Sequence, residues 1–222
     1  MYQLVENLEE YREHAAICRK PLEKVAEKLR KEFQVKATVQ PVGSYKLILM
    51  LKDEKGTYYV DYHIILTKKP MQLYKEPRKL RTFIDSNIQN YCKARKDTIR
   101  KNSATNLRYT LTTAKGERFV LNVEFLYRNH SKTGYIRLVY NKEQRTYGWT
   151  NMPGNCADIA TRIHRVEKYR LQEELRQKYL DRKNAALEAG EDSLSLPMLK
   201  QACVETLHLL HKKDLTNTSQ TL

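Results

Sequence analysis

The sequence predicts an α+β fold, in which a mixed β-sheet is flanked by helices and followed by a helical C-terminal segment. Three observations indicate it. The first thirty residues carry apolar side chains at helical spacing, the chain between 36 and 140 is rich in β-branched and aromatic residues around one helical stretch, and residues 156–189 are charged and lack glycine. Such periodicities separate helices from strands. The order of the elements favours an α+β class.

The N-terminal apolar stripe runs from Leu4 to Leu29, with steps that alternate between four and three residues. It includes Cys18, because a free thiol packs like a small apolar side chain. Pro21 interrupts the stripe. Since the missing N–H of proline is harmless in the first turn of a helix, we expect a second helix to begin there.

The first strands follow this helical region. Residues 36–42 predict a short strand that ends at the Gly43–Ser44 turn, and residues 57–66 (TYYVDYHIIL) predict a longer strand dominated by Val, Ile and Tyr. Residues 78–101 then carry apolar side chains at helical spacing. We therefore expect one long helix inserted between the strands of the sheet.

The second half begins with strands and ends in helices. Residues 106–129 predict a hairpin around Ala114-Lys115-Gly116, residues 135–140 predict another strand, and the cluster TNMPGN at 150–155 predicts a turn. After it we expect charged helices up to Gly190 and a final helix within 193–213, capped by Ser195.

Length and composition bound the class of protein. A chain of 222 residues with 41% hydrophobic and 30% charged residues fits one folded, soluble domain, or a domain with a helical appendage. No apolar run approaches the ~18 residues of a membrane span, and the acidic N-terminus does not fit a secretory signal. The four cysteines form no CxxC pair, so we expect reduced thiols and a cytoplasmic location.

The net charge of +15 favours polyanionic partners such as nucleic acid or nucleotide phosphates. The basic residues are spread along the chain rather than gathered in one run. A surface that is charged only for solubility is therefore the competing interpretation.

Two acidic residues occupy unexpected places. Asp61 lies in the middle of a predicted strand, and Glu124 has a similar place in VLNVEFLY, each among apolar neighbours. Two carboxylates on adjacent strands could hold Mg²⁺, while glycine at the Gly43–Ser44 turn would let the backbone approach a phosphate. The alternative is that each acid faces solvent on an open face of the sheet.

Residues 42–66 (VGSYKLILMLKDEKGTYYVDYHIIL) resemble the nucleotidyltransferase superfamily, in particular its bacterial oligoadenylate-synthase-like and cyclic-oligonucleotide-synthase-like branch. That branch carries a Gly-Ser turn, a strand with an Asp-x-Asp pair, a third acid on a later strand and C-terminal helices. Residues 140–184 fit the same branch, and the resemblance covers roughly 39–210.

The resemblance implies a nucleoside triphosphate as ligand and Mg²⁺ as cofactor. It also implies an α+β nucleotidyltransferase-like domain with N-terminal helices at 1–150 and a helical C-terminal segment with a frayed tail at 151–222. The implied nucleotide contacts are Gly43, Ser44, Tyr45 and Lys46; the implied catalytic acids are Asp61 and Glu124; the implied metal ligands are Asp61, His63 and Glu124.

The sequence departs from the family pattern at one important position. The Asp-x-Asp pair should fall at positions 59 and 61, but the chain reads Tyr59-Val60-Asp61. Tyrosine supplies neither charge nor a good Mg²⁺ ligand, whereas two-metal chemistry needs closely placed anionic ligands. Alternatively, Asp61 and His63 act as a displaced pair, because residues two apart share one face of a strand.

Three functions follow from these patterns. The first is a nucleotidyltransferase-family protein that binds a nucleotide or RNA, with weak or lost transfer of NMP. The second is an active transferase that uses Asp61, His63 and Glu124. The third is a non-enzymatic basic module that binds nucleic acid or a partner protein. The sequence leaves open whether the chain is an enzyme, and it does not indicate the oligomeric state.

Overall fold

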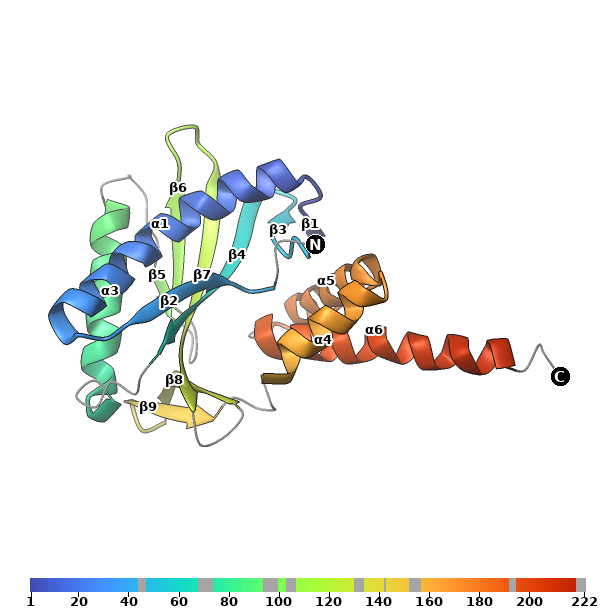
Figure 1. Cartoon of the computed structure of the whole chain (residues 1–222). Helices are drawn as coiled ribbons and strands as arrows, with labels where there is room; N and C mark the ends of the chain where they lie inside the picture. Colours follow the sequence, from blue (N-terminus) through green and yellow to red (C-terminus); the bar gives the residue numbers. More distant parts are fainter. Residues whose placement is uncertain are drawn as a thin grey trace.

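The computed structural model confirms the predicted α+β class, with a mixed sheet flanked by helices and a helical C-terminal part (Figure 1). The structure describes residues 1–43, 47–67, 74–93, 100–102, 107–129, 134–141, 143–151, 157–191 and 195–218. The elements are β1 (Tyr2–Leu4), α1 (Leu8–Phe33), β2 (Ala37–Pro41), β3 (Leu51–Asp53), β4 (Thr57–Leu66), α3 (Pro77–Lys93), β5 (Arg100–Asn102), β6 (Leu107–Thr112), β7 (Arg118–Asn129), β8 (Gly134–Asn141), β9 (Thr146–Asn151), α4 (Ala157–Lys168), α5 (Gln172–Glu188) and α6 (Ser195–Thr218).

The centre of the sheet is a parallel pair, β4 and β7. Strand β3 pairs with the first half of β4 and β2 with its second half, both antiparallel, and β1 lies outside β3. On the side of β7 away from β4, β6 pairs with the first half of β7 and β8 pairs with its C-terminal end. Strand β5 then pairs with β6, and β9 pairs with β8. In the central register, Asp61 lies opposite Asn122 and His63 opposite Glu124.

The two faces of the central pair differ in chemistry, because successive side chains point to opposite faces of a sheet. One face packs against α1 and α3 and is apolar, with buried residues such as Tyr62, Ile64 and Leu121. The other face carries the polar residues of β4 and β7. Ile65 and Leu126 on it pack with the C-terminal helices in a second apolar cluster.

Helix α1 is one unbroken helix, so the predicted helix start at Pro21 is wrong. Pro21 lies inside the helix, where it removes one backbone hydrogen bond. Its neighbours Cys18, Leu22 and Val25 are almost fully buried, and this packing on both sides of Pro21 outweighs the lost bond. The helix begins after the Asn7 cap, because residues 2–4 instead form β1 at the sheet edge.

The predicted strands are largely confirmed, and the differences come from strand pairing. Strand β4 spans the predicted 57–66, and β6 and β7 form the predicted hairpin. The predicted helix 78–101 ends earlier, since α3 stops at Lys93 and residues 100–102 pair with β6. Strand β9 was not predicted, and it takes the first two residues of the expected turn cluster; the rest of that cluster lies outside the described residues.

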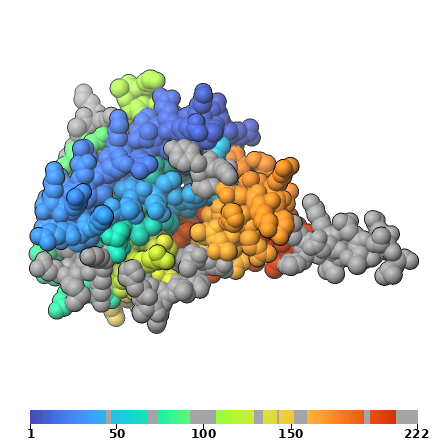
Figure 2. Space-filling model, viewed as in Figure 1, coloured from blue at the N-terminus to red at the C-terminus, as the bar shows by residue number. Residues whose placement is uncertain are grey.

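The C-terminal part consists of α4, α5 and α6, and its orange surface in Figure 2 lies directly against the N-terminal part. The segment expected to form charged helices up to Gly190 consists of α4 and α5, which are separated at Arg170, a residue with a left-handed φ of 56°. The second apolar cluster joins these helices to Val42, Leu47 and the sheet. A domain boundary near 150 therefore stays a prediction. Among the described residues, no helix is long and apolar enough to span a membrane.

Candidate functional site

A buried polar cluster lies where β4 and β7 run side by side beneath α5. We call it the Asp61 cluster, and its members are Asp61, His63, Asn122, Glu124, Tyr179, Lys183 and Ser195. Strands β4 and β7 supply the first four, α5 supplies Tyr179 and Lys183, and α6 begins with Ser195. Residues of these types are rarely buried unless they are paired or functional.

The Asp61 carboxylate is fully engaged. Its Oδ1 accepts a hydrogen bond from Asn122 Nδ2 at 2.9 Å. Its Oδ2 faces Lys183 Nζ at 3.5 Å and Tyr179 OH at 3.4 Å. Burial alone would raise the pKa of Asp61, but Lys183, Ser195 and Asn122 together hold it below its usual value. Asp61 is therefore an ionised, paired carboxylate.

Lys183 is the cation of the cluster. Only 4% of its side chain is exposed, and Nζ donates to Ser195 Oγ at 2.7 Å. Its Nζ also lies 5.5 Å from the centre of the Tyr179 ring. Burial and the charge of Asp61 raise the pKa of Tyr179 well above its usual value, so this hydroxyl stays a donor. The ammonium thus supplies the positive charge that a buried carboxylate requires.

Asn122 links the cluster to β6. Its Oδ1 accepts a hydrogen bond from Arg108 Nε at 2.8 Å, and Arg108 lies opposite Asn122 in the register. Because an amide has one acceptor and one donor end, this bond turns the Asn122 NH₂ group toward Asp61. Arg108 is therefore a positioning residue for the Asp61 carboxylate.

Glu124 and His63 form the opposite kind of pair. His63 Nε2 lies 3.5 Å from Glu124 Oε2, and within the described part of the chain neither that nitrogen nor either Glu124 carboxylate oxygen has a hydrogen-bond partner. Burial raises the pKa of Glu124 to about 7, against the opposing charge of Arg137. Burial also lowers the pKa of His63 to about 4. The pair is thus largely uncharged in mildly acidic solution.

Tyr59, at the position where the family pattern has its first acid, is engaged elsewhere. Its hydroxyl donates to Asp53 Oδ2 at 3.0 Å, and its ring meets Tyr2 edge-on with centroids 4.8 Å apart. Burial and Asp53 both raise the pKa of Tyr59. The residue joins β4 to β3 and β1, and it contributes no anion to the Asp61 cluster.

The predicted phosphate turn lies beside Asp61 in the fold. Val42 N–H donates to the Asp61 carbonyl at 2.9 Å, and Gly43 follows with a left-handed φ of 92°. A Cβ at Gly43 would lie 2.6 Å from Leu49 Cδ1, so the position requires glycine. The other three predicted nucleotide contacts, Ser44, Tyr45 and Lys46, lie outside the described residues.

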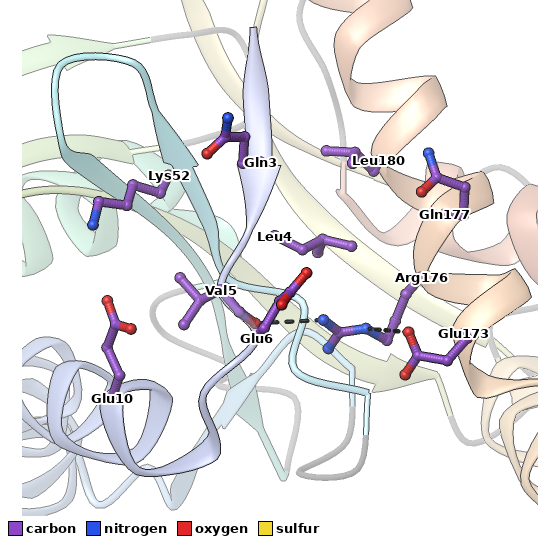
Figure 3. Close-up of a pocket in the computed structure, with 10 residues that line it drawn as sticks. All are labelled: Gln3, Leu4, Val5, Glu6, Glu10, Lys52, Glu173, Arg176, Gln177 and Leu180. Carbon is purple, nitrogen blue, oxygen red and sulfur yellow. Dashed lines mark hydrogen bonds and ion pairs between the residues drawn. The ribbon is translucent and has the colours of Figure 1, made fainter.

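Helix α5 is held over the sheet by Arg176, whose guanidinium is buried. Nη1 donates to the carbonyls of Leu47 at 2.7 Å and Ile48 at 3.0 Å, and Nη2 to that of Val5 at 3.4 Å. Figure 3 shows Arg176 between Val5 and Glu173 at the edge of a cavity of about 490 Å³. Ile48 has φ of 45°, unusual for a β-branched residue, and Arg176 stabilises that conformation.

A second attachment lies about two turns further along α5. Asn184 Oδ1 accepts from Tyr2 N–H at 2.7 Å, and Asn184 Nδ2 donates to the Tyr2 carbonyl at 3.2 Å. Lys183 lies between the two attachments. The helix that carries the ammonium is therefore fixed to β1 and to the segment before β3.

The predicted metal ligands come together only in part. Asp61, His63 and Glu124 share one face, yet the described residues hold no group of three His, Cys, Asp or Glu that could hold a metal ion. Asp61 already has partners on both oxygens, and the Lys183 ammonium would repel a second cation at Oδ2. In this arrangement the residues do not fit Mg²⁺.

Sequence reasoning missed Lys183, Tyr179 and Arg108. A signal for the first two exists: Leu175, Tyr179 and Lys183 recur every four residues on α5 and are all buried. A lysine on the buried stripe of a helix predicts a carboxylate opposite it. No comparable pattern identifies Arg108.

Comparisons with known proteins give structural matches only. The chain matches DncV cyclic AMP-GMP synthase of Vibrio cholerae with a linear intermediate (11% identity, TM-score 0.45) over 68% of this chain and 40% of that one. It matches the 3′-deoxy ATP-bound form of DncV with 11% identity and a TM-score of 0.46, over 75% of this chain and 44% of that one. It also matches the CD-NTase CdnG of Bradyrhizobium diazoefficiens in complex with GTP, with 14% identity and a TM-score of 0.42, over 68% of this chain and 41% of that one.

The chain therefore spans less than half the length of these three proteins. No family model and no curated protein matches the chain. Likenesses at these TM-scores and identities say nothing about side-chain chemistry. The matched structures are bacterial CD-NTases of the nucleotidyltransferase superfamily, the group that the sequence of this chain resembles.

Proposed function

We propose that this chain is a nucleotidyltransferase-like protein that binds a nucleoside triphosphate or RNA and transfers NMP little or not at all. The observation that carries the proposal is the buried Lys183 ammonium, which lies 3.5 Å from Asp61 Oδ2. Metal-dependent phosphoryl transfer needs that carboxylate as a cation ligand. In this chain a lysine takes the place of the cation.

Displacing Lys183 would be costly. A divalent ion at Asp61 would leave the ammonium buried without its counter-charge, and removing one partner from a buried pair destabilises a protein by about 3–5 kcal/mol. Tyr59 adds no negative charge to offset the desolvation of the ion. Glu124, with a pKa of about 7, is only partly ionised at neutral pH. Together these features disfavour metal-dependent transfer.

The nucleotide-binding part of the proposal rests on the turn and on charge. The Gly43 turn follows a strand bonded to Asp61, and it begins the segment with Ser44, Tyr45 and Lys46, which we propose as phosphate contacts. Backbone N–H groups at such a turn can bind phosphate. The net charge of +15 favours the same ligands. Mg²⁺ then accompanies the triphosphate as its counter-ion.

One observation favours the active-enzyme alternative. Both Glu124 oxygens and His63 Nε2 are buried without hydrogen-bond partners among the described residues, and such groups often await a ligand or proton. In an active enzyme, α5 would withdraw Lys183, and Asp61, His63 and Glu124 would bind the metal.

A transfer assay separates these functions. The protein is incubated with each labelled NTP and Mg²⁺ or Mn²⁺, and NTP affinity is measured with the same metals and with EDTA. We expect measurable affinity that EDTA does not abolish, and no product that depends on Asp61. Product that disappears in both Asp61→Asn and Glu124→Gln would establish the active enzyme.

The matched control for these variants is Asp181→Asn, an exposed carboxylate on α5. Affinity and product formation should be unchanged in this variant. An absence of binding to every NTP and to RNA would overturn the binding proposal itself.

A further inference from the structure

A second concave site lies away from the Asp61 cluster. The end of α1, the start of α3 and the turn before β9 surround a pocket of about 750 Å³, which we call the aromatic pocket. Figure 1 shows these elements on the side of the molecule opposite α5 and α6. No residue is shared between the aromatic pocket and the Asp61 cluster.

The floor of the aromatic pocket consists of three half-buried rings, Phe33, Phe83 and Tyr147. Phe33 and Phe83 pack at 90° with centroids 4.9 Å apart. The Arg81 guanidinium carbon lies over the Tyr147 ring, 5.7 Å from its centroid. Phe33 ends α1 and Phe83 lies in α3, so the rings are fixed by two packed helices. Because the two Phe rings are perpendicular and Arg81 lies over Tyr147, a planar group can stack on the face of one ring and meet the edge of another.

The rim of the pocket is strongly basic. Lys75, Arg78, Lys79 and Arg145 line it, and all four are exposed. The only carboxylate among the residues that line it is Glu76, which lies 3.4 Å from Lys79 Nζ in an exposed pair. Such pairs contribute little and break easily. The rim therefore presents an excess of positive charge to solvent.

The rim charges come from two segments that are far apart in the sequence. Lys75, Arg78 and Lys79 lie just before and at the start of α3, and Arg145 lies in the turn between β8 and β9. Arg145 has a left-handed φ of 52° in that turn. A chain that carries several phosphates can contact cations of both segments, whereas a single phosphate needs only one of them.

We propose that the aromatic pocket binds single-stranded nucleic acid, with one unpaired base stacked on one of the Phe33, Phe83 and Tyr147 rings and flanking phosphates on the rim cations. Base–aromatic stacking combined with a basic track is how proteins bind single strands without reading their sequence. A duplex keeps its bases stacked inside and cannot present one to the rings. This proposal is independent of nucleotide binding at the Gly43 turn.

The test measures fluorescence anisotropy of a labelled single-stranded RNA of about 12 nucleotides at several salt concentrations. Arg78→Ala combined with Arg145→Ala is compared with a control of equal charge, Lys55→Ala combined with Lys168→Ala, at exposed sites elsewhere. We expect the rim variant to bind about tenfold more weakly and to lower the salt slope by about 1.4, or ~0.7 per phosphate contact. The control should change neither.

Stacking is tested by Phe83→Leu and Tyr147→Leu, with circular dichroism to confirm folding. At least one folded variant should bind single strands about 5-fold to 100-fold more weakly. Three results would overturn the proposal: an equal loss in the charge-matched control, no loss in either ring variant, or competition by duplex, mononucleotide or polyglutamate as strong as by the single strand.

Discussion

The two faces of the central β4–β7 pair show how one sheet can carry a core and a site. Toward α1 and α3 the strands present only apolar and aromatic side chains, nearly all fully buried. Toward α5 the same strands present Asp61, His63, Asn122 and Glu124. Apolar burial needs only matching shapes, whereas buried polar groups each need a partner.

The polar face itself divides into two parts. Asp61 has a partner on each oxygen, and one of them is a buried ammonium. Among the described residues, Glu124 has His63 at 3.5 Å and no hydrogen-bond partner, and its pKa is raised where that of Asp61 is lowered. Two acids that the sequence places in one site thus have opposite electrostatic roles. Asp61 is a paired anion, whereas neither Glu124 oxygen has a hydrogen-bond partner among the described residues.

The largest effect on stability is expected from Lys183→Met, which removes the ammonium and leaves the buried Asp61 carboxylate without its cation. We expect a loss of about 3–5 kcal/mol in the free energy of unfolding, measured with urea. Combining Lys183→Met with Asp61→Leu should recover much of the loss, because replacing both partners by apolar groups is often neutral. Lys178→Met on the same helix is the control, and an equal loss there would contradict the pairing.

The second prediction concerns the pH dependence of stability that Glu124 and His63 cause. Glu124 has a raised pKa of about 7 against an ordinary 4.5, so the folded state holds a proton that the unfolded state releases. This makes stability fall as pH rises from about 4.5 to 7, by on the order of 3 kcal/mol in total. His63 has a lowered pKa of about 4 against 6.5. The stability that neutral His63 contributes is therefore lost as the pH falls from about 6.5 to 4. The pH dependences that Glu124 and His63 cause oppose each other.

Single variants should expose each slope. In Glu124→Gln, the free energy of unfolding in urea should rise with pH between about 4 and 6.5, because His63 is then the member of the pair that still titrates. In His63→Gln, stability should fall with rising pH between about 4.5 and 7. If the free energy of unfolding does not change with pH in either variant, the pKa values of Glu124 and His63 do not differ between the folded and unfolded states.

A smaller effect is expected from Arg176→Ala, which leaves three backbone carbonyls without their donor. We expect about 2–3 kcal/mol of lost stability, since hydrogen bonds to charged groups stabilise by about 1.5–3 kcal/mol each and water replaces some of them. Arg182→Ala, on the same helix, breaks a partly exposed pair with Glu205 and an exposed hydrogen bond to Gln201 Oε1, and should cost about 1 kcal/mol. Equal costs would argue against Arg176 as the attachment of α5.

The smallest effect is expected from Tyr59→Phe, which removes the hydrogen bond to Asp53 but keeps the ring against Tyr2. We expect about 1 kcal/mol or less in urea unfolding, and no change in NTP affinity. A marked change in NTP affinity would place this hydroxyl in the ligand site, contrary to its contacts.

Part of this structure is predictable from the sequence for local reasons. The β-branched and aromatic residues of 57–66 and the turn residues at 114–116 predict β4 and the hairpin. Asp61 and Glu124 share a face only because β4 and β7 pair in one parallel register, which no local pattern fixes. Short strands such as β1 and β9 exist only because a partner strand accepts their hydrogen bonds. Lys183 reaches Asp61 across 122 residues of sequence, so that contact depends on how α5 docks and not on any local pattern.

Metal binding by the Asp61 cluster tests the central claim most directly. Mn²⁺ is titrated without nucleotide into the wild type, Asp61→Asn and Glu124→Gln, and binding is followed by electron paramagnetic resonance of the free ion. Because Lys183 already neutralises Asp61, we predict that the three proteins retain the same weak Mn²⁺ binding. Tight binding by the wild type that both variants lose would show that the ammonium yields its place to the metal, and would contradict the account.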